Sequence, residues 1–186
     1  MACTNLGAMF DVDDLVAACH AAAEETQPLL AIRDVLERAV ADPVAIAEAL
    51  PPTRAELVPL HVSPELTVLK VVWGPGMLLG PHDHRMWAAI GIYSGGEDNR
   101  FFRRADGGLQ TSGDRSLEPR DVCLLGDDVI HQVYNPTAEC AGAIHVYGGD
   151  FFGTPRSEWT GDPLREGPYD VERVLSLFEA ANAELA

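Results

Sequence analysis

The chain is poor in basic residues, with 13 lysines and arginines against 29 aspartates and glutamates and a formal net charge of -16. An acidic surface repels nucleic acid phosphates and anionic lipid headgroups, so neither is an expected partner. No apolar run approaches the roughly 20 residues of a membrane-crossing helix. Met1 to Phe10 has no basic residue ahead of an apolar core, unlike a secretory signal. A cytoplasmic protein is therefore expected.

Cysteine is scarce and scattered. The sequence holds Cys3, Cys19, Cys123 and Cys140, with no CxxC pair. This spacing gives no indication of a zinc knuckle or a dithiol redox motif. Four cysteines could form two disulfides, but without a secretory signal we expect reduced thiols.

The chain of 186 residues, 47% of them hydrophobic, is long enough for one sizeable core and short for two. We therefore expect a single domain over residues 1–186. It divides into a helical section over 1–50, a β-rich section over 52–155 and a C-terminal helix over 168–186.

The helical section is predicted from apolar spacing. Apolar residues recur three and four positions apart between Val12 and Cys19, and again between Leu29 and Val40. Asp42-Pro43 should begin a third, short helix, because aspartate is a good N-cap and proline fits the first turn. The same spacing returns through Val171, Val174 and Phe178 near the C-terminus.

The β-rich section alternates short apolar runs with clusters of glycine, proline and aspartate. Many short strands with regular turns are typical of a β-sandwich or barrel. The strand candidates are residues 66–73, 87–93, 99–104, 122–125, 131–134 and 141–147.

Histidine is the most informative residue type here. His82 and His84 stand two apart in Gly-Pro-His-Asp-His, and along a strand such residues point to the same face. Two imidazoles at that spacing can occupy adjacent positions on one metal ion. His131, a few strands later, is the natural third ligand, while His20 and His61 look like ordinary histidines.

These histidines lie in two segments that resemble the paired motifs of the cupin superfamily. Five residues separate Gly76 from the His-x-His pair, and three separate His131 from Asn135. The resemblance implies a mainly β fold of the cupin type, a double-stranded β-helix or jelly-roll barrel, with helices at both ends.

Cupins often carry a glutamate shortly after the His-x-His pair, but this sequence has Ala88 and Ala89 there. The expected ligands are therefore three neutral imidazoles. Imidazole suits iron, zinc, copper and nickel, so the residues alone leave the metal open. A zinc ion on three histidines would activate water.

Three ordered motifs resemble the cysteine dioxygenase family, the cupin thiol dioxygenases, over roughly residues 52–155. They are the Trp73-Gly turn with His-Asp-His, then His131-Gln-Val-Tyr-Asn, then His145-Val-Tyr147. His-Asp-His-Arg-Met-Trp87 is most similar to the bacterial branch that acts on mercapto-carboxylic acids such as 3-mercaptopropionate.

The resemblance implies one Fe(II) ion on His82, His84 and His131, with a small thiol and O2 as substrates and a sulfinic acid as product. It implies that Tyr147 hydrogen-bonds the bound substrate or oxygen and that His145 orients Tyr147. A metal ion favours this chemistry because it lowers the pKa of a thiol.

The sequence departs from the family at two positions. Ala143 stands where members often have a serine that completes a Ser-His-Tyr relay. Ala89 stands where mammalian members have a cysteine crosslinked to the tyrosine, so no such crosslink forms.

A mercapto acid also needs a cation for its carboxylate, and arginine is the usual partner. Arg54 lies near the position of the arginine in cysteine-specific members, with Arg85 and Arg103 as rivals. Trp87 is expected in the core.

Two other functions stay open. One is a different metallo-cupin, for example an isomerase or hydrolase with zinc or manganese. The other is a cupin that binds a small molecule without catalysis. The sequence leaves a monomer and a homo-oligomer equally open.

Overall fold

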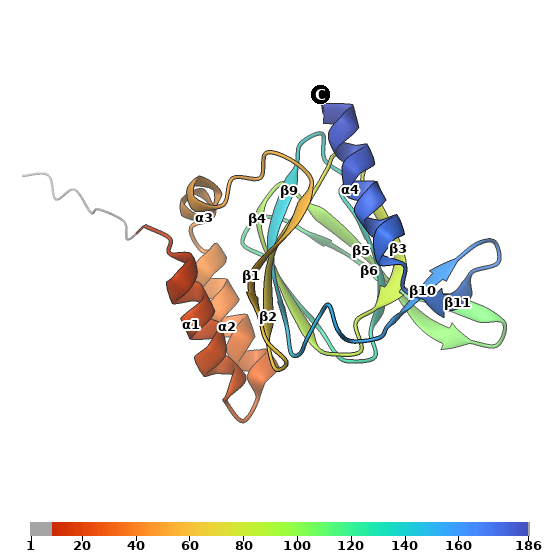
Figure 1. Cartoon of the computed structure of the whole chain (residues 1–186), viewed down its shortest axis with the longest axis horizontal. Coiled ribbons are helices and arrows are strands. Elements are labelled where there is room, and N and C mark those ends of the chain that lie inside the picture. The colour runs from red at the N-terminus through yellow and green to blue at the C-terminus, as the bar shows by residue number, and fades with distance from the viewer. Residues whose placement is uncertain (1–8, 186) are drawn as a thin grey trace, which may run out of the picture.

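The computed structural model describes residues 9–185 as two antiparallel β-sheets with helices at both ends (Figure 1). The first sheet has the order β1-β2-β9-β4-β7 and the second the order β11-β10-β3-β8-β5-β6. The strands are β1 Glu56–Val62, β2 Thr67–Trp73, β3 Leu78–Asp83, β4 Ala88–Ser94, β5 Glu97–Ala105, β6 Gly108–Leu117, β7 Val122–Leu125, β8 Ile130–Tyr134, β9 Ala141–Tyr147, β10 Ser157–Thr160 and β11 Arg165–Pro168.

The strand pairs are nested. β2 pairs with β9, β3 with β8, β4 with β7, and β5 with β6, all antiparallel. This is a long hairpin folded over on itself, which is the topology of a jelly roll. The predicted mainly β, cupin-type double-stranded β-helix with helices at both ends is confirmed.

The N-terminal helices cover the outer face of the first sheet (Figure 1). They are α1 Val12–Ala23, α2 Pro28–Val40 and α3 Pro43–Ala49. Asp42 caps α3 as predicted, with its Oδ1 accepting from the Ala45 amide at 3.2 Å. Asp11 caps α1 in the same way.

The first sheet is buried on both faces because helices lie outside it. In β9, Ala143 and Tyr147 face the barrel interior, whereas Ile144 and Val146 pack against the helices. This alternation explains why β2 and β9 read as nearly continuous apolar runs.

The C-terminal helix α4, Val171–Leu185, packs on the barrel interior rather than on the outer helices. The Phe178 ring stacks on Trp73 with centroids 5.5 Å apart. Gly74 permits this approach, since a Cβ there would lie 2.8 Å from the Ala181 Cβ. None of the helices within residues 9–185 is long and apolar enough to cross a bilayer.

Three strands without apolar alternation, β6, β10 and β11, were not predicted from the sequence. β6 is almost entirely exposed and forms through its pairing with β5. β10 and β11 extend the second sheet beyond residue 155, the predicted end of the barrel. That the chain is one domain stays a prediction. Cys19, Cys123 and Cys140 are free thiols, and Cys3 lies outside the described residues.

Candidate metal centre

The three predicted histidines meet inside the barrel. His82 lies near the end of β3 opposite His131 of β8, and His84 follows β3 directly. One ring nitrogen from each lies within 4.8 Å of the others, and all three residues are buried. Within residues 9–185 this is the only such group of histidine, cysteine or acidic side chains.

Hydrogen bonds fix which nitrogens face the centre. His82 Nδ1 bonds the Gly80 carbonyl at 3.0 Å, and His131 Nδ1 bonds Asn99 Oδ1 at 2.7 Å. Both acceptors are oxygens, so each Nδ1 carries a proton and each Nε2 keeps a lone pair. His84 Nε2 and His131 Nε2 lie 3.5 Å apart.

Burial keeps the imidazoles neutral. It lowers the pKa of His82 to about 4, and it lowers the pKa of His84 and His131 well below their usual range, with the neighbouring histidines adding to it. Neutral imidazole is the form that binds metal.

The geometry fits a divalent ion. Nitrogens about 2.0–2.1 Å from one ion, in adjacent positions, lie about 3.0–3.4 Å apart. The 3.5 Å between His84 and His131 is close to that separation. The cluster contains no carboxylate or thiolate, and Ala88 and Ala89 supply none.

Asn135, the last residue of the second motif, has a structural part. Its Nδ2 donates to the carbonyls of Trp73 and Gly74, each at 3.0 Å. Its backbone exchanges hydrogen bonds with Gly76 and Met77. Asn135 therefore ties the turn before β3 to the end of β8 and holds the two histidine strands in register.

Asp83 points away from the centre, as expected between two histidines that share a face. It is 1% exposed and forms ion pairs with Arg85 at 2.7 Å and Arg104 at 3.3 Å. Its Oδ1 also accepts from the Ser157 amide at 2.8 Å. Asp83 thus anchors the β10–β11 hairpin beside the histidines.

Tyr147 and His145 lie on the same interior face of β9, where the sequence placed them. His145 Nδ1 and the Tyr147 hydroxyl are hydrogen-bonded at 3.0 Å, and the Tyr147 ring lies 5.0 Å from that of His84. Burial raises the pKa of Tyr147, so its hydroxyl keeps its proton. Within the part of the chain that the structure describes, the buried His145 Nε2 has no hydrogen-bond partner.

Arg54 does not reach the histidines. Its side chain is 67% exposed and 3.8 Å from Glu56, in a shallow hollow with Asn182 and Leu185. Arg85 pairs with Asp83, and Arg103 bonds Gln110 on the surface. The structure therefore brings none of the three predicted arginines to the candidate site.

A different arginine, Arg156, lies beside the site. Its guanidinium stacks over the rings of Phe151 at 4.0 Å and Tyr169 at 4.2 Å, and both rings line the histidine cavity. Burial is the main cause of the lowered pKa of His82 and His84, and the positive charge of Arg156 lowers both pKa values further. The Arg156 Nε is buried and has no hydrogen-bond partner among residues 9–185.

The cavity in front of the histidines is small and mostly apolar. Its volume of about 20 Å³ suits one water molecule. The apolar lining includes Leu79, Val133 and Phe178. A substrate therefore needs the lining side chains to move aside.

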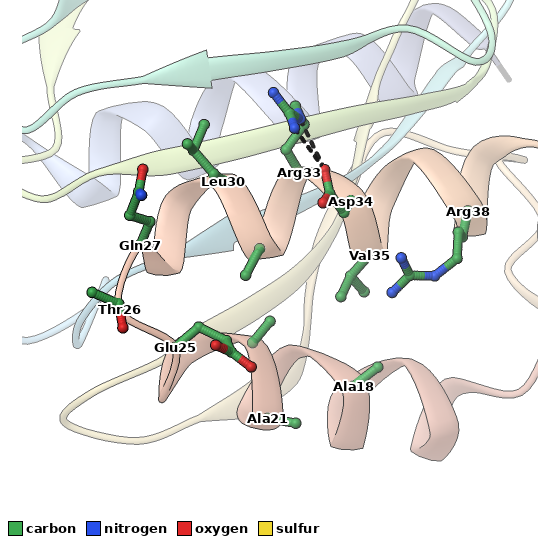
Figure 2. Close-up of a pocket in the computed structure, with 12 residues that line it drawn as sticks. Ala18, Ala21, Glu25, Thr26, Gln27, Leu30, Arg33, Asp34, Val35 and Arg38 are labelled. Atoms are coloured by element: carbon green, nitrogen blue, oxygen red, sulfur yellow. Dashed lines mark hydrogen bonds and ion pairs between the residues drawn. The ribbon is translucent and has the colours of Figure 1, made fainter.

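The largest hollow among residues 9–185 lies elsewhere, in the open groove between α1 and α2 (Figure 2). Its walls combine alanine and aliphatic side chains with polar and charged ones, among them an Arg33–Asp34 ion pair at 2.8 Å. Nothing in this groove resembles a catalytic group. Trp87 packs in the outer core beneath the helices, as expected.

Comparisons with known proteins find distant structural similarities only. The sequence matches none of the known protein-family models. The structure is similar to the cysteine peptidase Peruvianin-I from Thevetia peruviana latex, with 19% identity and a TM-score of 0.40 over 46% of this chain and 51% of that one. The chain thus covers about half of that protein.

Two further similarities are to bacterial and archaeal proteins. BH2720 from Bacillus halodurans has 16% identity and a TM-score of 0.49, with 56% of this chain and 77% of that one covered. An RmlC-like cupin family protein with a double-stranded β-helix fold from Methanocaldococcus jannaschii has 10% identity and a TM-score of 0.42, with 52% and 82% covered. At such identities a likeness concerns the fold alone.

Two residues near the histidines, Arg156 and Glu97, were not among the site residues predicted from the sequence. Arg156 follows the last barrel strand in a segment without periodicity, so nothing in the sequence marked it. Glu97 did leave a signal, because Glu97, Asn99 and Phe101 alternate along one strand and must share a face. Two polar residues on the interior face of a barrel strand indicate a buried network.

Proposed function

We propose that this chain is an Fe(II)-dependent thiol dioxygenase that acts on a small mercapto-carboxylic acid or cysteine. The observation that carries the proposal is a buried cluster of three neutral histidines without a carboxylate, beside Tyr147 and Arg156. The overall reaction adds both atoms of O2 to the sulfur of R-SH and gives R-SO2H.

Histidines 82, 84 and 131 would hold the iron through their Nε2 atoms. When bound, Fe(II) supplies the redox centre for the thiol and O2 and favours the thiolate form of the substrate. An uncharged ligand set leaves the positive charge of the ion available to that thiolate. The resemblance to the thiol dioxygenases favours iron over zinc, which on three histidines would activate water instead.

Arg156 would bind the substrate carboxylate. Its buried Nε has no partner, and a guanidinium forms strong, directed hydrogen bonds with a carboxylate. The Phe151 and Tyr169 rings, which the guanidinium stacks against, hold Arg156 in place. Substrates without a carboxylate should therefore be poor.

Tyr147 would orient the substrate from β9. Its hydroxyl keeps its proton and hydrogen-bonds His145, so its oxygen can accept a hydrogen bond from a group at the centre. Leu79, Val133 and Phe178 give the same space an apolar wall.

The test is metal content and oxygen uptake. Protein purified without chelators should carry about one iron per chain, and iron-loaded protein should consume O2 with 3-mercaptopropionate or cysteine. Cysteamine, which lacks the carboxylate, should be much poorer. His131→Ala should lose the iron and the activity, while His20→Ala, an exposed histidine, should keep both.

Three results would contradict the proposal. Iron-loaded protein that consumes no O2 with any of these thiols would remove the dioxygenase function. Bound zinc or manganese with oxygen-independent turnover would favour an isomerase or hydrolase. Full iron content in His131→Ala would remove His131 from the ligand set.

A further inference from the structure

Glu97, at the start of β5, is a carboxylate buried at 0% exposure. Its Oε1 accepts from Asn99 Nδ2 at 2.8 Å, and its Oε2 accepts from Trp73 Nε1 at 2.8 Å. His145 Nε2 lies 3.8 Å from the same Oε2. A buried charge is costly unless it is compensated, so this arrangement needs a reason.

The carboxylate is in its ionised form. Burial by itself would raise the pKa of Glu97, but the contacts with His145, Asn99 and Trp73 outweigh burial, and the pKa lies below its usual range. Asn99 and Trp73 donate N–H groups to the carboxylate, and these hydrogen bonds favour its charged form.

The first arm of this network runs to a metal ligand. Because Asn99 Nδ2 donates to the carboxylate, the amide oxygen of Asn99 must face His131. A flipped amide would place its oxygen against the carboxylate and its NH2 against His131. The oxygen accepts the Nδ1 proton of His131 and leaves the Nε2 lone pair toward the ion.

The second arm runs to Tyr147. A proton on His145 Nε2 faces the Glu97 carboxylate, whereas a lone pair there would face it with repulsion. With the proton on Nε2, Nδ1 is free to accept the hydroxyl proton of Tyr147. The carboxylate thereby favours one tautomer of His145.

We infer that Glu97 is a positioning residue that fixes the tautomers of both His131 and His145 from one buried carboxylate. Its carboxylate faces His145 Nε2, whereas Ala143 offers no hydroxyl. For metal binding the inference depends only on the three-histidine site, and for thiol oxidation it rests on the proposed function.

The test compares Glu97→Gln with a matched control, Glu56→Gln. The glutamine has one oxygen to accept from three donors, and its NH2 adds a fourth donor. Glu56 is a partly buried carboxylate that pairs with Lys70, outside the residues that line the cavity. Both substitutions remove one charge and keep the side-chain shape.

The primary measurement is the protonation of the histidine nitrogens, by long-range 1H–15N spectra of the full chain loaded with Zn(II). Wild-type protein and Glu56→Gln should show His131 protonated on Nδ1 and His145 on Nε2. In Glu97→Gln the His145 proton should move to Nδ1, at least in part. The dissociation constant for Fe(II) should rise about 10- to 100-fold.

Thiol oxidation is the secondary measurement. Glu97→Gln should lower kcat for 3-mercaptopropionate with little change in KM, since Arg156 is untouched. Tautomer and affinity changes in a protein that oxidises no thiol would support the positioning role and remove the proposed function. Active Glu97→Gln with wild-type tautomers and affinity would overturn the positioning role and leave the proposed function standing.

The wild-type spectra test the inference even if Glu97→Gln does not fold. A His145 that carries its proton on Nδ1, or a His131 that carries it on Nε2, would overturn the inference without any variant.

Discussion

Arg156 is the side chain that would set the substrate class in the proposed function. Its unpaired, buried Nε beside a histidine cavity is a donor that awaits an anion. Glu97 shows the complementary case, a buried anion that is surrounded by donors. The proposed role of each residue depends on the direction of its polar atoms. Charge alone would not distinguish Arg156 or Glu97 from the arginines and glutamates on the surface.

Arg156→Met should raise KM for 3-mercaptopropionate about 10- to 100-fold, because a hydrogen bond to a charged group contributes about 1.5–3 kcal/mol. Steady-state oxygen uptake measures it. Arg54→Met is the control and should match wild type, since Arg54 is exposed and away from the cavity. A raised KM in Arg54→Met, with wild-type KM in Arg156→Met, would restore Arg54 as the carboxylate partner.

Among the secondary-structure elements, α4 and the β10–β11 hairpin complete the site although neither belongs to the nested strand pairs. α4 supplies Val174 and Phe178 to the cavity wall, and Phe178 stacks on Trp73, which in turn donates to Glu97. The hairpin is flanked by Arg156 and Tyr169 and is held by Asp83. Stability and site geometry are therefore coupled at this end of the barrel.

Phe178→Ala should lower the free energy of unfolding by about 3 kcal/mol, because it leaves a cavity beneath α4. Phe178 is 5% exposed, whereas Leu175 on the same helix is 51% exposed. Leu175→Ala should therefore cost less than about 1 kcal/mol. Urea unfolding measures both, and similar losses for the two variants would show that α4 is not docked as described.

The whole molecule is an acidic barrel that encloses a neutral histidine cluster. The chain has a formal net charge of -16. Inside the barrel, burial lowers the pKa of the imidazoles and keeps them uncharged. Folding thus keeps protons off groups that would titrate near neutrality in an unfolded chain. This links stability to pH and to metal.

Metal-free protein should lose stability as pH falls from 7 to 5. The pKa of His82 is about 4 in the folded protein, below its ordinary 6.5, so between these values the unfolded chain binds more protons. Stability therefore rises with pH, and His82 alone accounts for about 2 kcal/mol over this interval. His84 and His131 act in the same direction.

Unfolding by urea at pH 7, 6 and 5, with a chelator present, measures this dependence. His82→Gln should show a shallower decline, and bound Zn(II) should raise stability at pH 7. A pH-independent free energy of unfolding in the metal-free wild type would contradict the burial of neutral histidines.

The sequence by itself determined the parts that depend on periodicity. Helical spacing located α1, α2 and α4, and apolar runs located β2, β7 and β9. The two-residue spacing of His82 and His84 placed both on one face, and the paired motifs indicated His131 as their partner. These features depend on the spacing of residues that are close together in the chain, so the sequence alone predicts them.

Only the tertiary structure decided which distant side chains meet. β6 and the β10–β11 hairpin form by pairing with other strands, and their own residues carry no apolar alternation. Nothing in the sequence distinguishes Arg54 from Arg156 as a candidate for the site. The tertiary structure exposes Arg54 and buries the Nε of Arg156 beside the histidines. Contacts between residues far apart in the chain depend on strand register and helix docking, which no local pattern records.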